Sequence, residues 1–243
     1  TPVTSGYLVC RLLLAKKKYD FDGVIVDSER LHHETMVEAM AGQGPATPWE
    51  FYREHLMGFD DRGAFAVLLE RAGIEPTPEE VRRRIARKAE LFAQHAAAGR
   101  VPAFPGAADL VRACAASGPV GLCSGALRSD VDPVLAALDL ADCFAEKVTA
   151  EDVAASKPDP ACYRLCVAKL AARFPDRGLA PAVCVAIEDT DDGIVSARGA
   201  GIPVVAVATN LPADWLRAAG AAAVVDRLAG LTPARLAALA GLA

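Results

Sequence analysis

Short apolar segments alternate with helical segments along most of this chain, and this alternation constrains the fold more than any other feature. Residues 120–123, 183–187, 204–207 and 223–225 have the length and composition of buried strands, and helical segments separate them. Repeated strand–helix–strand units build a parallel sheet that helices cover on both faces. The sequence therefore predicts an α/β protein with a Rossmann-like parallel sheet, whose first strand is the apolar segment 7–15.

The helical segments follow the same rhythm. We predict helices at residues 107–117, 131–140, 160–173, 193–200, 215–219 and 233–240. The large side chains Trp49, Phe51 and Trp215 are expected in the hydrophobic core.

The segment from residue 29 to residue 103 differs from the rest, because it is rich in Glu and Arg and its apolar positions have helical spacing. One helix start is well marked: Thr77 is a good N-cap, Pro78 suits the first helical position, and Glu80 the third. Gly99 is expected to end that helix. We therefore expect a small all-helical cap domain at residues 29–103, inserted after the first strand, and an α/β core formed by residues 1–28 and 104–243.

Charge and cysteine content exclude several classes of protein. The 31 Asp and Glu outnumber the 26 Lys and Arg, whereas a nucleic-acid binder usually shows a basic face. The longest uncharged runs contain Pro and Gly, which argues against a membrane span. An odd number of cysteines (7) without a CxxC pair is typical of small buried side chains in a reducing compartment. Basic residues follow the N-terminal apolar stretch, the reverse of a secretory signal, so we expect a cytoplasmic protein with no nucleic-acid or membrane partner.

Polar and charged residues follow the predicted strands or open a helix between them, and ligands bind at this edge of a parallel sheet. The set is Asp20, Asp22, Ser124, Gly125, Lys157, Glu188 and Asp189. Clustered carboxylates are costly unless a cation lies among them, and oxygen ligands without His or Cys select a hard ion. The sequence therefore predicts a Mg²⁺ site.

These residue types suit phosphoryl transfer. A carboxylate can attack phosphorus and form an aspartyl-phosphate, while a second carboxyl two residues away acts as general acid and then as general base. A lysine and a serine hydroxyl can neutralise the phosphoryl oxygens, and Mg²⁺ can bridge nucleophile and phosphate. Every group that this reaction needs is present in the chain.

Four motifs occur in order along the chain. They are Asp20-Phe21-Asp22-Gly23 with the following Val24-Ile25-Val26-Asp27-Ser28-Glu29, then Cys123-Ser124-Gly125, Ser156-Lys157-Pro158-Asp159-Pro160 and Ile187-Glu188-Asp189-Thr190-Asp191-Asp192-Gly193. Taken together, they resemble the motifs of the haloacid dehalogenase superfamily of phosphatases and phosphomutases. The chain is most similar to the β-phosphoglucomutase-like, or CbbY-like, subgroup, which carries a helical cap of the C1 type after the first motif.

The resemblance implies a role for each motif residue. Asp20 would be the nucleophile and Asp22 the acid/base, and dehalogenases of similar pattern lack this second Asp. The phosphate-binding residues would be Ser124, Gly125 and Lys157. The metal-binding residues would be Asp20, Asp22 through its main-chain carbonyl, Asp189 and Glu188.

The chain departs from the family pattern at two places. Lys16, Lys17 and Lys18 precede the nucleophile where an apolar strand is expected, and we have no physical account of them. Asp61 stands where the mutases carry an Arg that grips a second phosphate, with Arg62 one residue later, and this favours hydrolysis over phosphate transfer.

The cap residues expected to contact the substrate are His32, Arg62 and Lys88, while His33 is expected to face solvent. Asp191 and Asp192 fit a helix-capping role better than a catalytic one.

The leading hypothesis is a Mg²⁺-dependent phosphatase for a small phosphorylated metabolite such as a sugar phosphate, acting as a monomer or weak homo-oligomer. A phosphomutase on the same machinery is the nearest alternative. A phospho-receiver domain also uses Asp, a hydroxyl, Lys and Mg²⁺, but Asp22, the inserted cap and the long separation of Asp20 from Lys157 argue against it. A catalytically inactive binding protein remains an alternative that the complete set of groups disfavours.

Overall fold

The computed structural model describes residues 23–56, 59 and 61–242. The predicted first strand at residues 7–15 and the predicted catalytic pair Asp20 and Asp22 lie outside the described residues. The helices are α1 (Glu29–Ala39), α2 (Trp49–His55), α3 (Asp61–Arg71), α4 (Pro78–Ala97), α5 (Ala107–Ser117), α6 (Arg128–Ala137), α7 (Ala161–Arg173), α8 (Asp191–Gly199), α9 (Ala213–Ala218) and α10 (Pro233–Leu239). The strands are β1 (Gly121–Cys123), β2 (Glu146–Val148), β3 (Ala186–Glu188), β4 (Val204–Val207) and β5 (Ala223–Val225).

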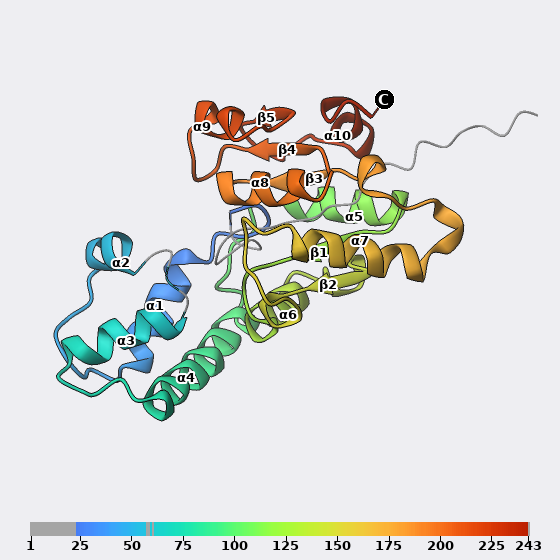
Figure 1. Cartoon of the computed structure of the whole chain (residues 1–243). Coiled ribbons are helices and arrows are strands. Elements are labelled where there is room, and N and C mark those ends of the chain that lie inside the picture. Colours follow the sequence, from blue (N-terminus) through green and yellow to red (C-terminus); the bar gives the residue numbers. More distant parts are fainter. Residues whose placement is uncertain (1–22, 57–58, 60, 243) are drawn as a thin grey trace, which may run out of the picture.

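The described strands form two parallel sheets, one of β1 and β2 and the other in the order β3-β4-β5. Successive side chains of a strand point to opposite faces, and the core follows this rule. Ile187 and Val205 pack in one buried cluster with α5 and α10, whereas Ala186 and Val204 pack in another with α7 and α8. Helices therefore cover both faces, which confirms the predicted α/β class (Figure 1).

Helices α1 to α4, which we call the helical unit, share a hydrophobic cluster that includes Met36, Tyr52 and Phe65. This helical unit lies to one side of the sheets, and α4 reaches from it to α6 (Figure 1). The predicted start of α4 is confirmed, because the Thr77 hydroxyl accepts a hydrogen bond from the Glu80 amide at 3.2 Å.

Strand β2 is the one described strand that the sequence did not predict. Its first residues, Glu146 and Lys147, are charged and half-buried, so the segment lacks an apolar run. Their charges are paired on the surface: Lys147 with Asp132 at 2.6 Å, and Glu146 with Arg173 at 3.3 Å. Long-range pairing with β1 makes this segment a strand.

One predicted burial state is wrong. The Trp215 side chain is 64% exposed, because the short helix α9 buries Leu216 against the sheet and turns Trp215 outward. His33, expected to face solvent, is half-buried: its ring packs beside Trp49 and Tyr52, and its Nε2 lies 2.8 Å from the Thr47 carbonyl oxygen.

Most of the described cysteines are small buried side chains, as predicted. The six described cysteines are all free; five are buried and Cys143 is half-buried. None of the described helices is long and apolar enough to cross a membrane.

Candidate active site

Two of the predicted charged residues, Lys157 and Glu188, meet at the carboxyl end of the strands. Glu188 is the last residue of β3, and Lys157 lies in the loop that precedes α7. The Lys157 Nζ lies 3.5 Å from Glu188 Oε1 and 3.5 Å from the carbonyl oxygen of Cys123, the last residue of β1. Both charged side chains are buried. The structure thus brings together groups from two strands and one loop, as the position of the motifs predicted.

Ser124 directly follows β1 and is fixed by the turn that it begins. Its amide donates to the Val148 carbonyl at 2.8 Å, which extends the β1–β2 ladder by one bond. Its hydroxyl accepts from the Ala126 amide at 3.1 Å, which shapes the backbone around Gly125. Ser124 is therefore buried and fixed in position, and it directly follows Cys123, whose carbonyl oxygen lies near the Lys157 ammonium group.

Gly23, the last residue of the first motif, packs against Asp189. The Asp189 Oδ2 accepts a hydrogen bond from Asn210 Nδ2 at 2.8 Å, and the Thr209 hydroxyl donates to the Gly23 carbonyl at 2.5 Å. Gly23 has φ +91°, and a Cβ at this position would lie 2.2 Å from Asp189 Oδ2. The first and fourth motifs therefore meet, with Asp20 and Asp22 of the first motif outside the described residues.

Sequence reasoning missed three residues of this region. Thr209 and Asn210 lie two and three residues after the end of β4, so the rule that ligand-binding groups follow strands could have found them. Tyr163 lies on α7, and its hydroxyl donates to Glu188 Oε1. Burial raises the pKa of the Tyr163 hydroxyl well above its usual value, and the negative charge of Glu188 is the second largest cause of this shift. No sequence pattern marked this tyrosine.

The donors that are described fit a hard cation. Glu188 and Asp189 are adjacent, fully buried carboxylates, and burying two such charges is costly without a positive partner. Within the described ranges no three His, Cys, Asp or Glu side chains are close enough to hold a metal ion. A complete Mg²⁺ site therefore needs further donors, and the predicted ones, Asp20 and Asp22, precede the described residues.

Cys123 is excluded as a nucleophile. Burial raises the pKa of its thiol well above the usual value, so the sulfur is a neutral thiol at physiological pH.

Lys88 joins the helical unit to the sheet-bearing part of the chain. It lies on α4, fully buried, with its Nζ 3.1 Å from Asp61 Oδ2 on α3 and 3.1 Å from Asp130 Oδ2 on α6. Burial alone would lower the pKa of Lys88, but Asp130 and Asp61 reverse the effect and raise it. Burial raises the pKa of Asp130. Two carboxylates thus share one ammonium group in this cluster.

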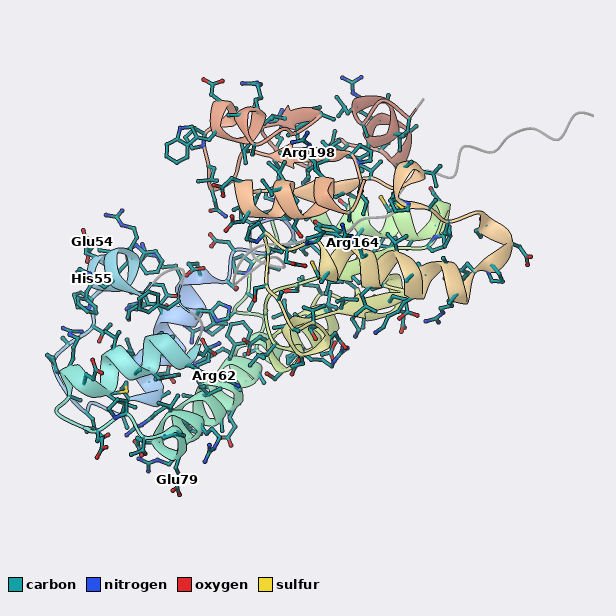
Figure 2. The ribbon with its side chains drawn as sticks, viewed as in Figure 1. Glu54, His55, Arg62, Glu79, Arg164 and Arg198 are labelled. Carbon is teal, nitrogen blue, oxygen red and sulfur yellow. The ribbon has the colours of Figure 1, made fainter. Side chains whose placement is uncertain are left out.

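The other two predicted substrate-contacting residues lie in different surroundings. His32 is buried and stacks on Phe92 of α4 with the ring centroids 4.5 Å apart. Arg62 is exposed on the first turn of α3 (Figure 2). Substrate contact by His32, Arg62 and Lys88 stays a prediction. Asp191 and Asp192 occupy the first turn of α8, as expected of helix-start residues.

Gly23→Ala is expected to disturb the site more than an ordinary glycine replacement. The variant combines backbone strain of about 1–2 kcal/mol with a Cβ that must displace the Asp189 carboxylate. Gly99→Ala is the matched control, because Gly99 also has a positive φ (+71°) but has no atom within 4 Å of the added Cβ. We expect the predicted hydrolysis of a phosphate ester to fall in Gly23→Ala and to stay normal in Gly99→Ala, while thermal unfolding reports the strain in each. Equal activity of the two variants would contradict the close packing of Gly23 against Asp189.

The family model of haloacid dehalogenase-like hydrolases matches residues 19–201, which is most of the chain and includes all four motifs. The chain belongs to this family. Protein CbbY of Rhodobacter capsulatus is 31% identical over 193 residues, covering 77% of this chain and 82% of the relative. Hexitol phosphatase B of Escherichia coli K12 is 29% identical over 184 residues, covering 75% and 78%.

A solved structure agrees with this assignment. A CbbY variant from Rhodobacter sphaeroides in complex with xylulose-(1,5)bisphosphate has a TM-score of 0.74 and 25% identity to this chain, and the match covers 94% of this chain and 99% of that one. The protein is therefore an enzyme, a haloacid dehalogenase-like phosphatase of the CbbY- and β-phosphoglucomutase-like subgroup.

Proposed function

We propose that this enzyme hydrolyses phosphorylated sugars in a Mg²⁺-dependent reaction that passes through an aspartyl-phosphate on Asp20. The main observation behind the proposal is that the buried side chains of Lys157, Glu188 and Asp189 lie beside Gly23, the last residue of the Asp20-Phe21-Asp22-Gly23 motif. The sugar assignment is supported by the relatives, one a hexitol phosphatase and one bound to a sugar bisphosphate.

Each residue has a defined task in this proposal. Asp20 attacks phosphorus, and Asp22 protonates the leaving sugar oxygen and then deprotonates the attacking water. Lys157, the Ser124 hydroxyl and the Gly125 amide hold the phosphoryl oxygens. Mg²⁺, held by Asp20, the Asp22 carbonyl, Asp189 and Glu188, would supply charge neutralisation at the phosphate.

The helical unit would act as the cap in this proposal, with residues 29–103 as the cap domain and residues 1–28 and 104–243 as the catalytic core. Its role would be to close over the substrate and to exclude bulk water. Hydrolysis is favoured over mutase activity because Asp61 brings a negative charge to α3 and is paired with Lys88. A carboxylate at this place cannot donate hydrogen bonds to a second phosphate group as an arginine would.

The test is a phosphate-release screen with sugar monophosphates, hexitol phosphates, sugar bisphosphates and nucleotides. We expect orthophosphate release from the sugar and hexitol phosphates with Mg²⁺ present, loss of release with EDTA, and recovery when Mg²⁺ is added in excess. Hydrolysis of nucleotides alone would contradict the sugar assignment. Release that EDTA leaves unchanged would contradict the metal assignment, and conversion of a sugar phosphate to its isomer without release would identify a mutase.

A further inference from the structure

We propose that Asn210 is a positioning residue for the predicted cation site, because it orients the Asp189 carboxylate and thereby raises the affinity of the site for its divalent cation. The inference rests on the proposed function for the identity of the cation as Mg²⁺. Asn210 acts through Asp189 in this proposal and contacts neither the cation nor the substrate.

The contact between the two side chains is direct. The Asn210 Nδ2 donates a hydrogen bond to Asp189 Oδ2 at 2.8 Å, a normal length for an N–H···O bond, which is about 2.7–3.2 Å. Asp189 is fully buried, whereas Asn210 is an exposed residue. A hydrogen bond to one carboxylate oxygen restricts the rotation of the group about its last bond. The orientation of Asp189 therefore depends on a residue that contributes little to the hydrophobic core.

The sheet brings these two residues together. Strands β3 and β4 are parallel neighbours, with Glu188 opposite Ala206. Asp189 directly follows β3, and Asn210 lies three residues after the end of β4. Both residues therefore lie at the carboxyl edge of the sheet, where ligands bind in folds of this kind.

The loop that carries Asn210 is attached at two further points. The Ala208 amide donates to the Val225 carbonyl at 2.9 Å, which continues the pairing of β4 with β5. The Thr209 hydroxyl donates to the Gly23 carbonyl at 2.5 Å, and a Cβ on Gly23 would lie 2.6 Å from Asn210 Nδ2. The Asn210 side chain thus starts from a backbone that β5 and the first motif hold in place, which makes its amide a fixed donor.

A fixed donor matters because Mg²⁺ binding is sensitive to ligand geometry. Mg²⁺ requires nearly ideal octahedral coordination at about 2.0–2.1 Å, whereas Ca²⁺ accepts variable geometry at about 2.3–2.6 Å. Hydrogen-bond partners of metal-binding carboxylates orient them, and the loss of such a partner typically weakens metal binding about 10–100-fold. If Asn210 sets the orientation of Asp189, its loss should therefore weaken Mg²⁺ binding more than Ca²⁺ binding.

The experiment compares two variants in which leucine replaces an exposed amide side chain. Asn210→Leu removes the donor and keeps nearly the same side-chain volume. The matched control is Gln94→Leu, because Gln94 is also exposed but lies on α4 of the helical unit, outside the candidate site. Binding of Mg²⁺ and of Ca²⁺ is measured by calorimetry without substrate, and circular dichroism and thermal unfolding report the fold.

We expect the Mg²⁺ affinity to fall about 10–100-fold in Asn210→Leu and to stay at the wild-type value in Gln94→Leu. The Ca²⁺ affinity of Asn210→Leu falls by a smaller factor, because Ca²⁺ tolerates a misoriented carboxylate. In kinetics, the Mg²⁺ concentration for half-maximal rate rises by the same factor as the Mg²⁺ dissociation constant, while kcat at saturating Mg²⁺ stays within a few-fold of wild type.

Four results would overturn the proposal: an unchanged or higher Mg²⁺ affinity in Asn210→Leu, an equal loss in Gln94→Leu, an equal loss for Mg²⁺ and Ca²⁺, or failure of Asn210→Leu to fold. An equal loss for both ions would mean that the amide does not act through ligand geometry. Failure to fold would mean that the exposed Asn210 supports the structure of the loop instead. If the enzyme bound Mg²⁺ but released no phosphate from any sugar phosphate, the proposed function would fail, yet the calorimetric titration would still decide the role of Asn210.

Discussion

Asp20→Asn is expected to lower kcat for phosphate release by about 10⁴-fold or more, while circular dichroism and the thermal unfolding temperature stay close to wild type. The amide has nearly the shape of the carboxylate but carries no negative charge, so it is a poor nucleophile toward phosphorus. The loss should appear in kcat, because the covalent step itself is removed while groups such as Lys157 still bind the phosphate.

Asp27→Asn is the matched control for this variant. Asp27 is exposed, lies seven residues further along the same segment, and bonds through its backbone amide to the Pro102 carbonyl at 3.0 Å. The same change of side chain should therefore leave kcat within about two-fold of wild type. Rapid acid quench with labelled substrate should trap a phosphoenzyme in wild type and none in Asp20→Asn. Normal turnover in Asp20→Asn would remove Asp20 as the nucleophile.

Lys88→Met is expected to lower the free energy of unfolding by about 3–5 kcal/mol at pH 8, the cost of leaving a buried charge without its partner. Methionine fills nearly the same space but leaves the Asp61 and Asp130 carboxylates facing each other without the ammonium between them. Urea unfolding measures the difference. Arg87→Met is the control, because Arg87 is exposed and pairs with Glu90 on the surface, and it should change stability by less than about 0.5 kcal/mol.

The pH dependence of this loss has a defined sign. Burial raises the pKa of Asp130 above its ordinary value of 3.8. Between 3.8 and the pKa in the folded state, the folded protein therefore binds more protons than the unfolded chain. In this pH range the free energy of unfolding falls as the pH rises. Removing Lys88 takes away a charge that lowers this pKa, so the window extends to higher pH. The stability lost in Lys88→Met should therefore be larger at pH 8 than at pH 5.

A second substitution checks the origin of the loss. Adding Asp130→Asn to Lys88→Met removes one of the two stranded carboxylates, and we expect part of the lost stability to return. No recovery in the double variant, or the same loss at both pH values, would show that the Lys88 side chain matters for packing and not for charge.

Local sequence patterns predicted most of the helices and strands, and several members of the candidate site that lie next to strands. Apolar spacing predicted helices such as α4, with its Thr77 cap, because a helix depends on neighbours three and four residues apart. The placement of Lys157 near Glu188 followed from one rule, that the carboxyl ends of parallel strands share an edge. The position of Asp20 and Asp22 in the structure stays a prediction.

Other features depended on contacts between distant parts of the chain, which no local pattern reports. Residues 146–148 form a strand because they pair with β1. Trp215 is exposed because its neighbour Leu216 is the residue of α9 that is buried against the sheet. Lys88 meets Asp61 and Asp130 across 27 and 42 residues of sequence, and Tyr163 reaches Glu188 across 25. Composition and spacing show which charged and polar side chains a chain carries. They do not show which of these side chains pair, because a charge that packing removes from water needs a partner, and a distant part of the fold can supply it.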